Sequence, residues 1–361
     1  MMINKKRLLN TFIELVKVDS PSGEEQAIAK DLVARLNALG LKAALDSYGN
    51  VVGRLEGEGE PFMLNAHMDT VEPGRNIRPI IKKSQIKSDG TTILGGDCKA
   101  GLSIILEALS VLKEEKLEHP PLEVVFTREE ETSLTGARQL DYSLISAKRG
   151  LTFDGPGQVT NVIVAAPFYN NIDIVITGIS AHAGVEPEKG LSAIKVASEL
   201  ITKLKVGRID FETTANVGLI KGGSARNAVP ESVEVKAEIR SRNLKKLLRH
   251  TKHFEDVISV TRKKNEGAII QANIHREFDG FVFSKNHPIV KKLLSTYKEL
   301  DLTPNLLKSG GGTDVNIFIT HGLELVCVGV GVYEPHTKRE YVKTPEMGQA
   351  AEFLINFLKN H

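Results

Sequence analysis

One short apolar segment that ends in polar residues constrains the fold of this chain most. Residues 61–64 read Pro-Phe-Met-Leu, and residues 65–71 continue as Asn-Ala-His-Met-Asp-Thr-Val. A short apolar run of this kind predicts a buried strand, so His67 and Asp69 are expected where the strand opens into a loop. Two residues apart in extended backbone, they point to the same side. A carboxylate beside an imidazole is also the usual way to orient a metal-binding histidine.

Acidic residues and a second histidine recur at comparable places farther along the chain. They are Asp97 just ahead of an apolar helix, Glu130 and Glu131 after a strand over 122–127, Asp154 after a strand over 150–153, and His336 beyond a strand over 325–330. Taken alone, each has an ordinary explanation, such as a helix cap, a turn or a solvated charged run. Because ligands bind at the carboxyl ends of strands in open α/β sheets, we expect these groups to converge at one edge. Two imidazoles and three carboxylates exceed what one tetrahedral zinc uses, and they suit two cations that share a carboxylate.

The middle of the chain has a different pattern. At 361 residues the chain exceeds the usual size of a single core, so two domains are expected. The pattern predicts a ferredoxin-like strand-helix-strand-strand-helix-strand order over 172–177, 191–204, 213–220, 232–239, 244–260 and 268–275. We therefore predict an α/β fold in which residues 1–169 and 282–361 form a catalytic, metal-binding domain. Residues 170–281 would be an inserted α+β domain that serves as a lid or dimerisation domain.

Composition excludes several classes of partner. The net charge is +2 and both signs are interspersed, so we expect neither a nucleic acid nor a membrane as partner. Only two cysteines, Cys98 and Cys327, are present, which favours a reducing compartment over a disulfide framework. Residues 4–17 have the spacing of an amphipathic helix rather than of a signal peptide, so the cytoplasm is the expected location. Ser22 with Glu25 predicts the capping box of a second helix.

Seven motifs, taken together and in order, resemble those of the M20 metallopeptidases. They are His-Met-Asp-Thr-Val at 67–71, Gly-Gly-Asp-Cys-Lys-Ala-Gly at 95–101, Glu-Glu-x-x-x-x-Gly-Ala at 130–137, Phe-Asp-Gly at 153–155, Ser-Ala-His-Ala-Gly at 180–184, Gly-Gly-Thr-Asp at 311–314 and the late histidine at 336. The resemblance covers essentially the whole chain, and it is closest to the peptidase T-like (aminotripeptidase-like) branch. It implies a zinc-exopeptidase-like catalytic domain, with a mixed sheet flanked by helices.

The resemblance also implies a role for each residue of the predicted centre. His67 and Asp154 would hold one Zn²⁺, Glu131 and His336 would hold the other, and Asp97 would bridge the two, with Co²⁺ or Mn²⁺ as alternative metals. Asp69 would orient His67, and Glu130 would be the general base. The run of three glutamates also allows the pair Glu129-Glu130, but counting back from Gly136-Ala137 favours 130 and 131. The family pattern has a second aspartate, and a cis peptide, where this chain has Cys98.

Three residues of the inserted domain complete the expected site. The resemblance implies that His182 polarises the scissile carbonyl and that Asn227 contacts the substrate. Val233, Val235, Ala237 and Ile239 alternate inward along a predicted strand, so Arg240 is expected on the polar face. A guanidinium there would clamp a substrate carboxylate, although a surface arginine explains the pattern equally well. Because these groups lie on a separate domain, catalysis would require domain closure or a partner subunit, with a homodimer through the inserted domain as one solution.

The expected activity is that of a two-zinc hydrolase of short peptides, an aminopeptidase that releases the N-terminal residue of dipeptides or tripeptides. Three alternatives stay open. The first is an amidohydrolase of the same family that deacylates N-acyl amino acids, because the reaction is the same and only the pocket differs. The second is a peptide-binding homologue that keeps the fold without the chemistry. A purely structural metal cluster is a third, more distant option.

Overall fold

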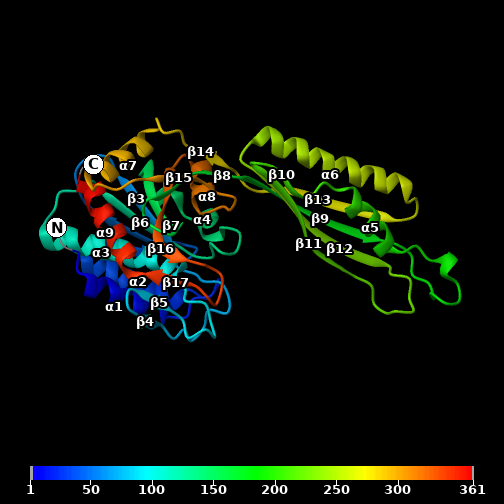
Figure 1. The fold of residues 1–361 in the computed structure, drawn as a ribbon, viewed down its shortest axis with the longest axis horizontal. Helices are drawn as coiled ribbons and strands as arrows, with labels where there is room; N and C mark the ends of the chain where they lie inside the picture. The colour runs from blue at the N-terminus through cyan, green and yellow to red at the C-terminus, as the bar shows by residue number, and fades with distance from the viewer. Residues whose placement is uncertain (1–2, 360–361) are drawn as a thin grey trace. The chain divides into compact units, whose positions relative to one another are not determined.

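The structure, a computed structural model, describes residues 3–359 and divides into two compact units (Figure 1). The smaller unit contains Ala165–Val282 and Gly310–Gly312. The larger unit contains the described residues up to Val164, then Phe283–Ser309, and the chain from Thr313 onward. In sequence, the larger unit is therefore built from segments that precede and segments that follow the smaller unit.

A mixed sheet forms the centre of the larger unit. Its strands follow the order β1-β2-β6-β3-β7-β16-β17-β5-β4, and β8 pairs with β14, β15 and β16. Their bounds are β1 (Lys42–Leu45), β2 (Val51–Leu55), β3 (Phe62–His67), β4 (Ile80–Lys82), β5 (Gln85–Lys87), β6 (Leu122–Thr127), β7 (Arg149–Pro156), β8 (Asn161–Ala166), β14 (Phe281–Val282), β15 (Asn305–Lys308), β16 (Glu324–Tyr333) and β17 (Tyr341–Lys343). The central strands β6, β3, β7 and β16 run parallel, so their carboxyl ends meet at one edge.

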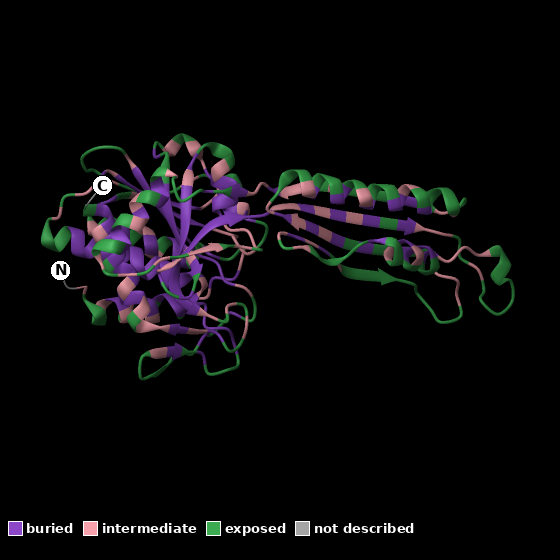
Figure 2. Cartoon of the chain, turned by 45° about the horizontal axis from the view of Figure 1, so that its top comes forward, coloured by how far each residue is buried: buried purple, intermediate pink, exposed green. Residues whose placement is uncertain are grey.

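The register of the parallel strands aligns the residues that follow them. His67 is opposite Thr127 of β6, and Asn65 is opposite Thr152 of β7. Counting two residues further along both strands brings His67 level with Asp154. All residues of β3 and β6 are buried, as the purple strands of Figure 2 show. Predominantly apolar strands that are buried along their whole length are typical of parallel sheets covered on both faces.

Helices flank this sheet. They are α1 (Lys5–Val16), α2 (Gln26–Leu39), α3 (Gly96–Glu115), α4 (Thr135–Gln139), α7 (Pro288–Glu299), α8 (Val315–Phe318) and α9 (Thr344–Lys359), with the short 3₁₀ turns η1 (Tyr142–Leu144) and η3 (Ile319–His321). Helix α3 contacts β3, β7 and β16, and α9 packs against α3 and β16. Phe357 of α9 lies 5.3 Å from Phe62 of β3, between ring centroids. The predicted mixed α/β fold, with a sheet flanked by helices, is confirmed.

The predicted capping box of Ser22 and Glu25 is wrong, and the ordinary explanation of Asp97 as a helix cap does not apply either, because both side chains bind elsewhere. Helix α2 begins after Glu25 without a side-chain cap, because the Ser22 hydroxyl donates to the Asp69 carboxylate. Helix α3 follows Gly95, and Asp97 has non-helical dihedral angles. The Asp97 side chain therefore turns away from the helix and is available to the strand edge.

The smaller unit is an antiparallel sheet covered by two helices. Its strands follow the order β10-β11-β12-β9-β13. The bounds are β9 (Phe168–Thr177), α5 (Ala193–Lys203), β10 (Gly207–Asp210), β11 (Thr213–Gly222), β12 (Ser232–Ser241), α6 (Leu244–Lys264) and β13 (Ile269–Phe278), with η2 at Pro187–Lys189. The order strand-helix-strand-strand-helix-strand is present, with β10 as an additional edge strand. The four residues predicted to alternate inward along β12 are all buried in the core of this unit.

Among residues 3–359, none of the helices combines the length and the apolar character that crossing a bilayer requires.

Candidate metal centre

His67 is the last residue of β3, and its buried ring has partners on both nitrogens. On one side, Nδ1 lies 3.0 Å from the main-chain oxygen of Asp69 and 3.3 Å from its carboxylate. On the other side, Nε2 lies 3.1 Å from Asp97 Oδ1 and 3.4 Å from Asp154 Oδ1. The ring is thus held through Nδ1 and presents Nε2 to two carboxylates, which is the orientation a metal-binding histidine needs.

The Asp69 carboxylate connects His67 to the turn that carries the glutamates. Its Oδ1 accepts from the backbone N–H of Glu130 at 2.9 Å. Its Oδ2 accepts from the N–H of Glu131 at 3.2 Å and from the Ser22 hydroxyl at 2.6 Å. Burial raises the pKa of Asp69, but the bonds with His67 and Ser22 outweigh it and hold that pKa below its usual value. Asp69 is therefore an anion that fixes two sides of the centre.

Asp97 lies between the two histidines. Its Oδ1 faces His67 Nε2, and its Oδ2 lies 3.3 Å from His336 Nε2. The same His336 nitrogen is 2.9 Å from Glu131 Oε1. Ligand-capable atoms of His67, Asp97 and Asp154 lie within 4.8 Å of one another, and so do those of Asp97, Glu131 and His336. The structure thus brings the five predicted ligands into two groups that share Asp97.

Electrostatics within the two groups are dominated by crowded carboxylates. The adjacent carboxylates of Asp97 and Glu131 raise the pKa of His336 to about 10. Burial raises the pKa of Asp154 to about 7. Burial also acts to raise the pKa of Asp97, but His336 and His67 hold it well below its usual value. Cationic imidazoles thus compensate the acidic groups here, and a divalent cation would do so more strongly.

The donor set fits divalent metal ions. Glu131 Oε1 is buried and makes no hydrogen bond, because its 2.9 Å approach to His336 lacks hydrogen-bond geometry. A buried carboxylate oxygen without a donor is costly unless a cation pairs it. Imidazole nitrogens and carboxylate oxygens are ligands that zinc and related transition metals accept.

The three consecutive glutamates, Glu129 to Glu131, do not all face the centre. Glu129 has a positive φ of 48° and directs its carboxylate to Arg128, 3.2 Å away. Carboxylate oxygens of Glu130 and Glu131 instead lie within 4.8 Å of a His67 ring nitrogen. Burial and the nearby Asp154 raise the pKa of Glu130 well above its usual value. Glu130 and Glu131 are therefore the pair that faces the centre.

Cys98 is near the first group but has a separate partner. The Asp97–Cys98 peptide bond is cis, as the resemblance implied. The buried thiol donates to the main-chain oxygen of Phe153 at 2.6 Å, and burial raises its pKa well above the usual value. A buried thiol that stays protonated is poorly reactive.

The chain matches a known peptidase family over most of its length. The model of "Peptidase family M20/M25/M40" matches residues 63–360, which includes every residue of the centre. The chain belongs to this peptidase family. The resemblance to the M20 metallopeptidases inferred from the motifs is thereby confirmed.

Relatives of the M20 chain match it from end to end. A crystal structure of a tripeptidase from Staphylococcus aureus Mu50 is 37% identical, with a TM-score of 0.95 over 100% of this chain and 99% of that one. A crystal structure of the aminopeptidase PepT from Bacillus cereus ATCC 10987 is 38% identical, with a TM-score of 0.91 over 99% of both chains. The uncharacterized protein YqjE of Bacillus subtilis strain 168 is 38% identical over 99% of both sequences.

The three residues predicted to bind substrate lie in the smaller unit, at two different ends of it. His182 is exposed and bridges to Ala228, and the N–H of Ala183 donates to the main-chain oxygen of Asn227 at 2.9 Å. These loops adjoin the end of the sheet where Ser232 pairs with Thr177. Arg240 lies at the other end of β12, where it binds Glu238 at 3.0 Å and covers the Tyr169 ring at 4.2 Å. The structure brings His182 and Asn227 together, and it separates both from Arg240.

Some residues that support the M20 centre were not identified from the sequence. Glu25 accepts from the N–H groups of Gly23 and Glu129 and pairs with Arg128 at 2.8 Å, which stabilises the start of the glutamate turn. Asp314, in the glycine-rich loop, is buried and accepts from the Thr127 hydroxyl. Asp314 could have been identified from the Gly-Gly-Thr-Asp motif that contains it. The sequence around Glu25 indicated only a helix cap with Ser22, and not the contacts with Gly23, Arg128 and Glu129.

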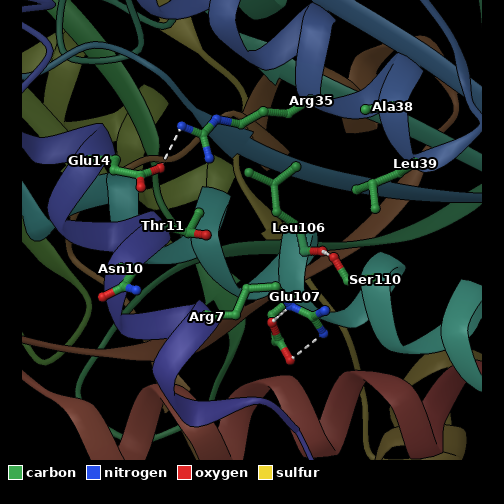
Figure 3. A pocket seen from close by; sticks show the side chains of 10 residues that line it. All are labelled: Arg7, Asn10, Thr11, Glu14, Arg35, Ala38, Leu39, Leu106, Glu107 and Ser110. Atoms are coloured by element: carbon green, nitrogen blue, oxygen red, sulfur yellow. Dashed lines mark hydrogen bonds and ion pairs between the residues drawn. The ribbon is translucent and has the colours of Figure 1, made fainter.

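A cavity of about 440 Å³ lies elsewhere, among α1, α2 and α3 (Figure 3). None of the predicted site residues lines it. Its charged side chains are already paired, Arg7 with Glu107 and Arg35 with Glu14. The cavity is thus distinct from the metal centre and has a lining whose charges compensate one another.

Proposed function

We propose that this M20 protein is a two-metal aminopeptidase that releases the N-terminal residue of short peptides, with tripeptides as the preferred substrates. The single observation that carries the proposal is the position of Asp97. Each of its carboxylate oxygens faces a different histidine, 3.1 Å from His67 and 3.3 Å from His336. A carboxylate shared in this way is what a bridge between two cations requires.

The residues that would hold the metals follow from the two groups. His67 and Asp154 would hold one ion, Glu131 and His336 would hold the other, and Asp97 would serve both. A bound pair of Zn²⁺, Co²⁺ or Mn²⁺ would supply Lewis-acid polarisation of the carbonyl and a nucleophilic water at neutral pH. Zinc is the ion we propose, because its protein ligands are typically histidine nitrogens and carboxylate oxygens.

Glu130 would act as the general base. Its carboxylate is close to His67 and Glu131, and burial keeps its pKa high. A carboxylate with a raised pKa accepts a proton more readily than an ordinary one, which suits a general base. Asp69 would hold His67 and the glutamate turn in place, through the hydrogen bonds that it makes to both.

The smaller unit would contribute groups that bind the substrate. His182 would polarise the scissile carbonyl, Asn227 would contact the peptide, and Arg240 would bind its carboxylate. Along β12, Ser232 and Arg240 are eight residues apart, which is roughly 26 Å at about 3.3 Å per residue. The His182 and Asn227 end and the Arg240 end of a single copy of this unit are therefore too far apart to contact the same tripeptide. We propose that the protein acts as a homodimer, in which the two copies each supply one end.

The substrate class rests on the relatives. Two solved structures that match the whole chain, at 37% and 38% identity, are named as a tripeptidase and an aminopeptidase. A free terminal amine would distinguish such a substrate from an N-acyl amino acid, which the alternative amidohydrolase would take.

The test is a substrate panel with metal analysis. Metal-depleted protein is loaded with zinc, cobalt or manganese, and release of free amino acid is measured from trialanine, dialanine and N-acetylalanine. We expect about two ions per chain, on the precedent of paired-metal peptidases, and the highest kcat/KM on trialanine. Faster hydrolysis of N-acetylalanine would contradict the aminopeptidase proposal. A fully loaded protein that cleaves none of the three would contradict an enzymatic role in small-amide hydrolysis.

A further inference from the structure

A buried glutamate holds the loop that carries Asp97. The side chain of Glu340, which is 1% exposed, accepts three backbone hydrogen bonds from this loop. Its Oε2 accepts from the N–H of Leu94 and of Gly95, each at 2.8 Å. Its Oε1 accepts from the N–H of Asp97 at 3.0 Å. Both oxygens therefore accept from the main chain, and among the described residues Glu340 belongs to none of the clusters of ligand-capable atoms.

The loop is shaped to receive this carboxylate. Gly95 has left-handed dihedral angles, φ 71° and ψ 28°, and successive N–H groups in such a turn form a concavity that binds anions. A Cβ on Gly96 would come within 3.1 Å of Glu340 Oε1 and 2.6 Å of Val342 Cγ2. The two adjacent glycines thus allow the close approach of the carboxylate to the backbone.

Glu340 is itself fixed by the strand pair that carries the other end of the centre. Its N–H donates to the main-chain oxygen of Thr337 at 3.0 Å. The next residue begins β17, which pairs with β16 through Val342 and Val332. His336 lies in the loop between these two strands. One carboxylate therefore joins the His336 loop to the Asp97 loop.

We infer that Glu340 is a positioning residue, which sets Asp97 so that its two oxygens face His67 and His336 and so shapes the site for both ions. This inference rests on the proposed two-metal function. Glu340 is not itself a ligand, because its oxygens are used by backbone donors. Partners of this kind, one step removed from a metal, set the orientation of the ligands and hence the affinity of the site.

The test compares two substitutions of Glu340 with a matched control. Glu340→Gln keeps the shape of the side chain but turns an NH₂ group toward N–H donors. Glu340→Asp keeps the charge but withdraws the carboxylate by one methylene. Glu107→Gln is the control, because Glu107 is 2% exposed and accepts from the backbone N–H of Asn4 and from Arg7. It lies in α3 near the cavity of Figure 3 rather than at the loop.

The readout is zinc affinity, measured by competition with a chromophoric chelator, with thermal unfolding of the metal-free proteins alongside. We expect each folded Glu340 variant to bind zinc about 10- to 100-fold more weakly than the unsubstituted protein, the range for such partners. We expect Glu107→Gln to keep the original affinity, whatever its effect on the unfolding temperature. If Glu340→Gln does not fold, Glu340→Asp supplies the comparison.

Three results would overturn the inference. A folded Glu340 variant with unchanged zinc affinity would show that the loop holds Asp97 without the carboxylate. An equal loss in Glu107→Gln would show that general destabilisation causes the effect. Failure of the unsubstituted protein to bind zinc, cobalt or manganese would instead remove the proposed two-metal function, and this inference with it.

Discussion

Replacing Asp69 by Asn removes the anion that connects His67 to the glutamate turn. In the structure, both oxygens of Asp69 accept hydrogen bonds, from the N–H groups of Glu130 and Glu131 and from Ser22. An asparagine offers one oxygen, so its NH₂ group must face at least one of these donors. The least costly orientation lets the Ser22 hydroxyl turn and accept, and leaves the Glu131 N–H without an acceptor.

The magnitude follows from the lost bond. A hydrogen bond to a charged group contributes about 1.5–3 kcal/mol, and an unsatisfied buried N–H costs about as much. We therefore expect Asp69→Asn to lower the free energy of unfolding of the metal-free protein by about 3 kcal/mol at pH 7. Because Glu131 and His67 both lose their support, we also expect zinc affinity to fall about 10- to 100-fold.

The sign of the pH dependence is fixed by the direction of the pKa shift. The pKa of Asp69 is lower in the folded protein than its usual value, which is about 3.9 in an unfolded chain. The stabilisation is therefore complete above that value and is lost as the pH falls through the folded pKa. The difference in unfolding free energy between the unsubstituted protein and Asp69→Asn should therefore become smaller as the pH falls.

The assay is denaturant unfolding of the metal-free proteins at pH 7 and at acid pH, followed by zinc titration with a competing chelator. Asp31→Asn, at the surface ion pair with Arg35, is the control, because exposed pairs contribute only about 0–1 kcal/mol. An Asp69→Asn protein with the stability and zinc affinity of this control would refute the reasoning.

Three further predictions follow from the centre and the sheet. Glu130→Gln should lower kcat about 10²- to 10⁴-fold, the range for a lost general base, with unchanged zinc content. The matched Glu129→Gln should retain kcat, and equal losses in steady-state assays would contradict the assignment. The pKa of Glu130 is raised, and a general base must be deprotonated to act. As the pH is lowered, kcat/KM should therefore begin to fall at a pH higher than the usual pKa of a glutamate. A profile flat down to pH 4 would contradict this. Phe126→Ala, in the fully buried β6, should cost about 3–5 kcal/mol of unfolding free energy, and a loss under 1 kcal/mol in denaturant titration would contradict the packing described here.

The strand ends were the part of the site most readily predicted. His67 and Asp154 each follow an apolar run on neighbouring parallel strands, whose register brings such residues together. His336 also follows an apolar strand, but it lies in the loop between β16 and β17. The two-residue period of a strand likewise predicted the inward side of β12. Apolar runs and the two-residue alternation can be read directly from the sequence, whereas the order of the strands in the sheet requires the structure.

Partners that depend on tertiary contacts could not be predicted. Ser22 and Asp97 have the local features of helix caps, but Asp69 binds Ser22 and the two histidines attract Asp97. The N–H donors that Glu340 binds are 243 to 246 residues away in the sequence. The separation of Arg240 from His182 required the strand register, since both lie close to predicted strand ends.

The most direct test of the two-metal centre is a crystal structure of the zinc-loaded protein, with anomalous diffraction recorded on both sides of the zinc edge. We expect two zinc peaks, one bound by His67 and Asp154, the other by Glu131 and His336, with Asp97 contacting both. A single peak, or peaks at other residues, would contradict it.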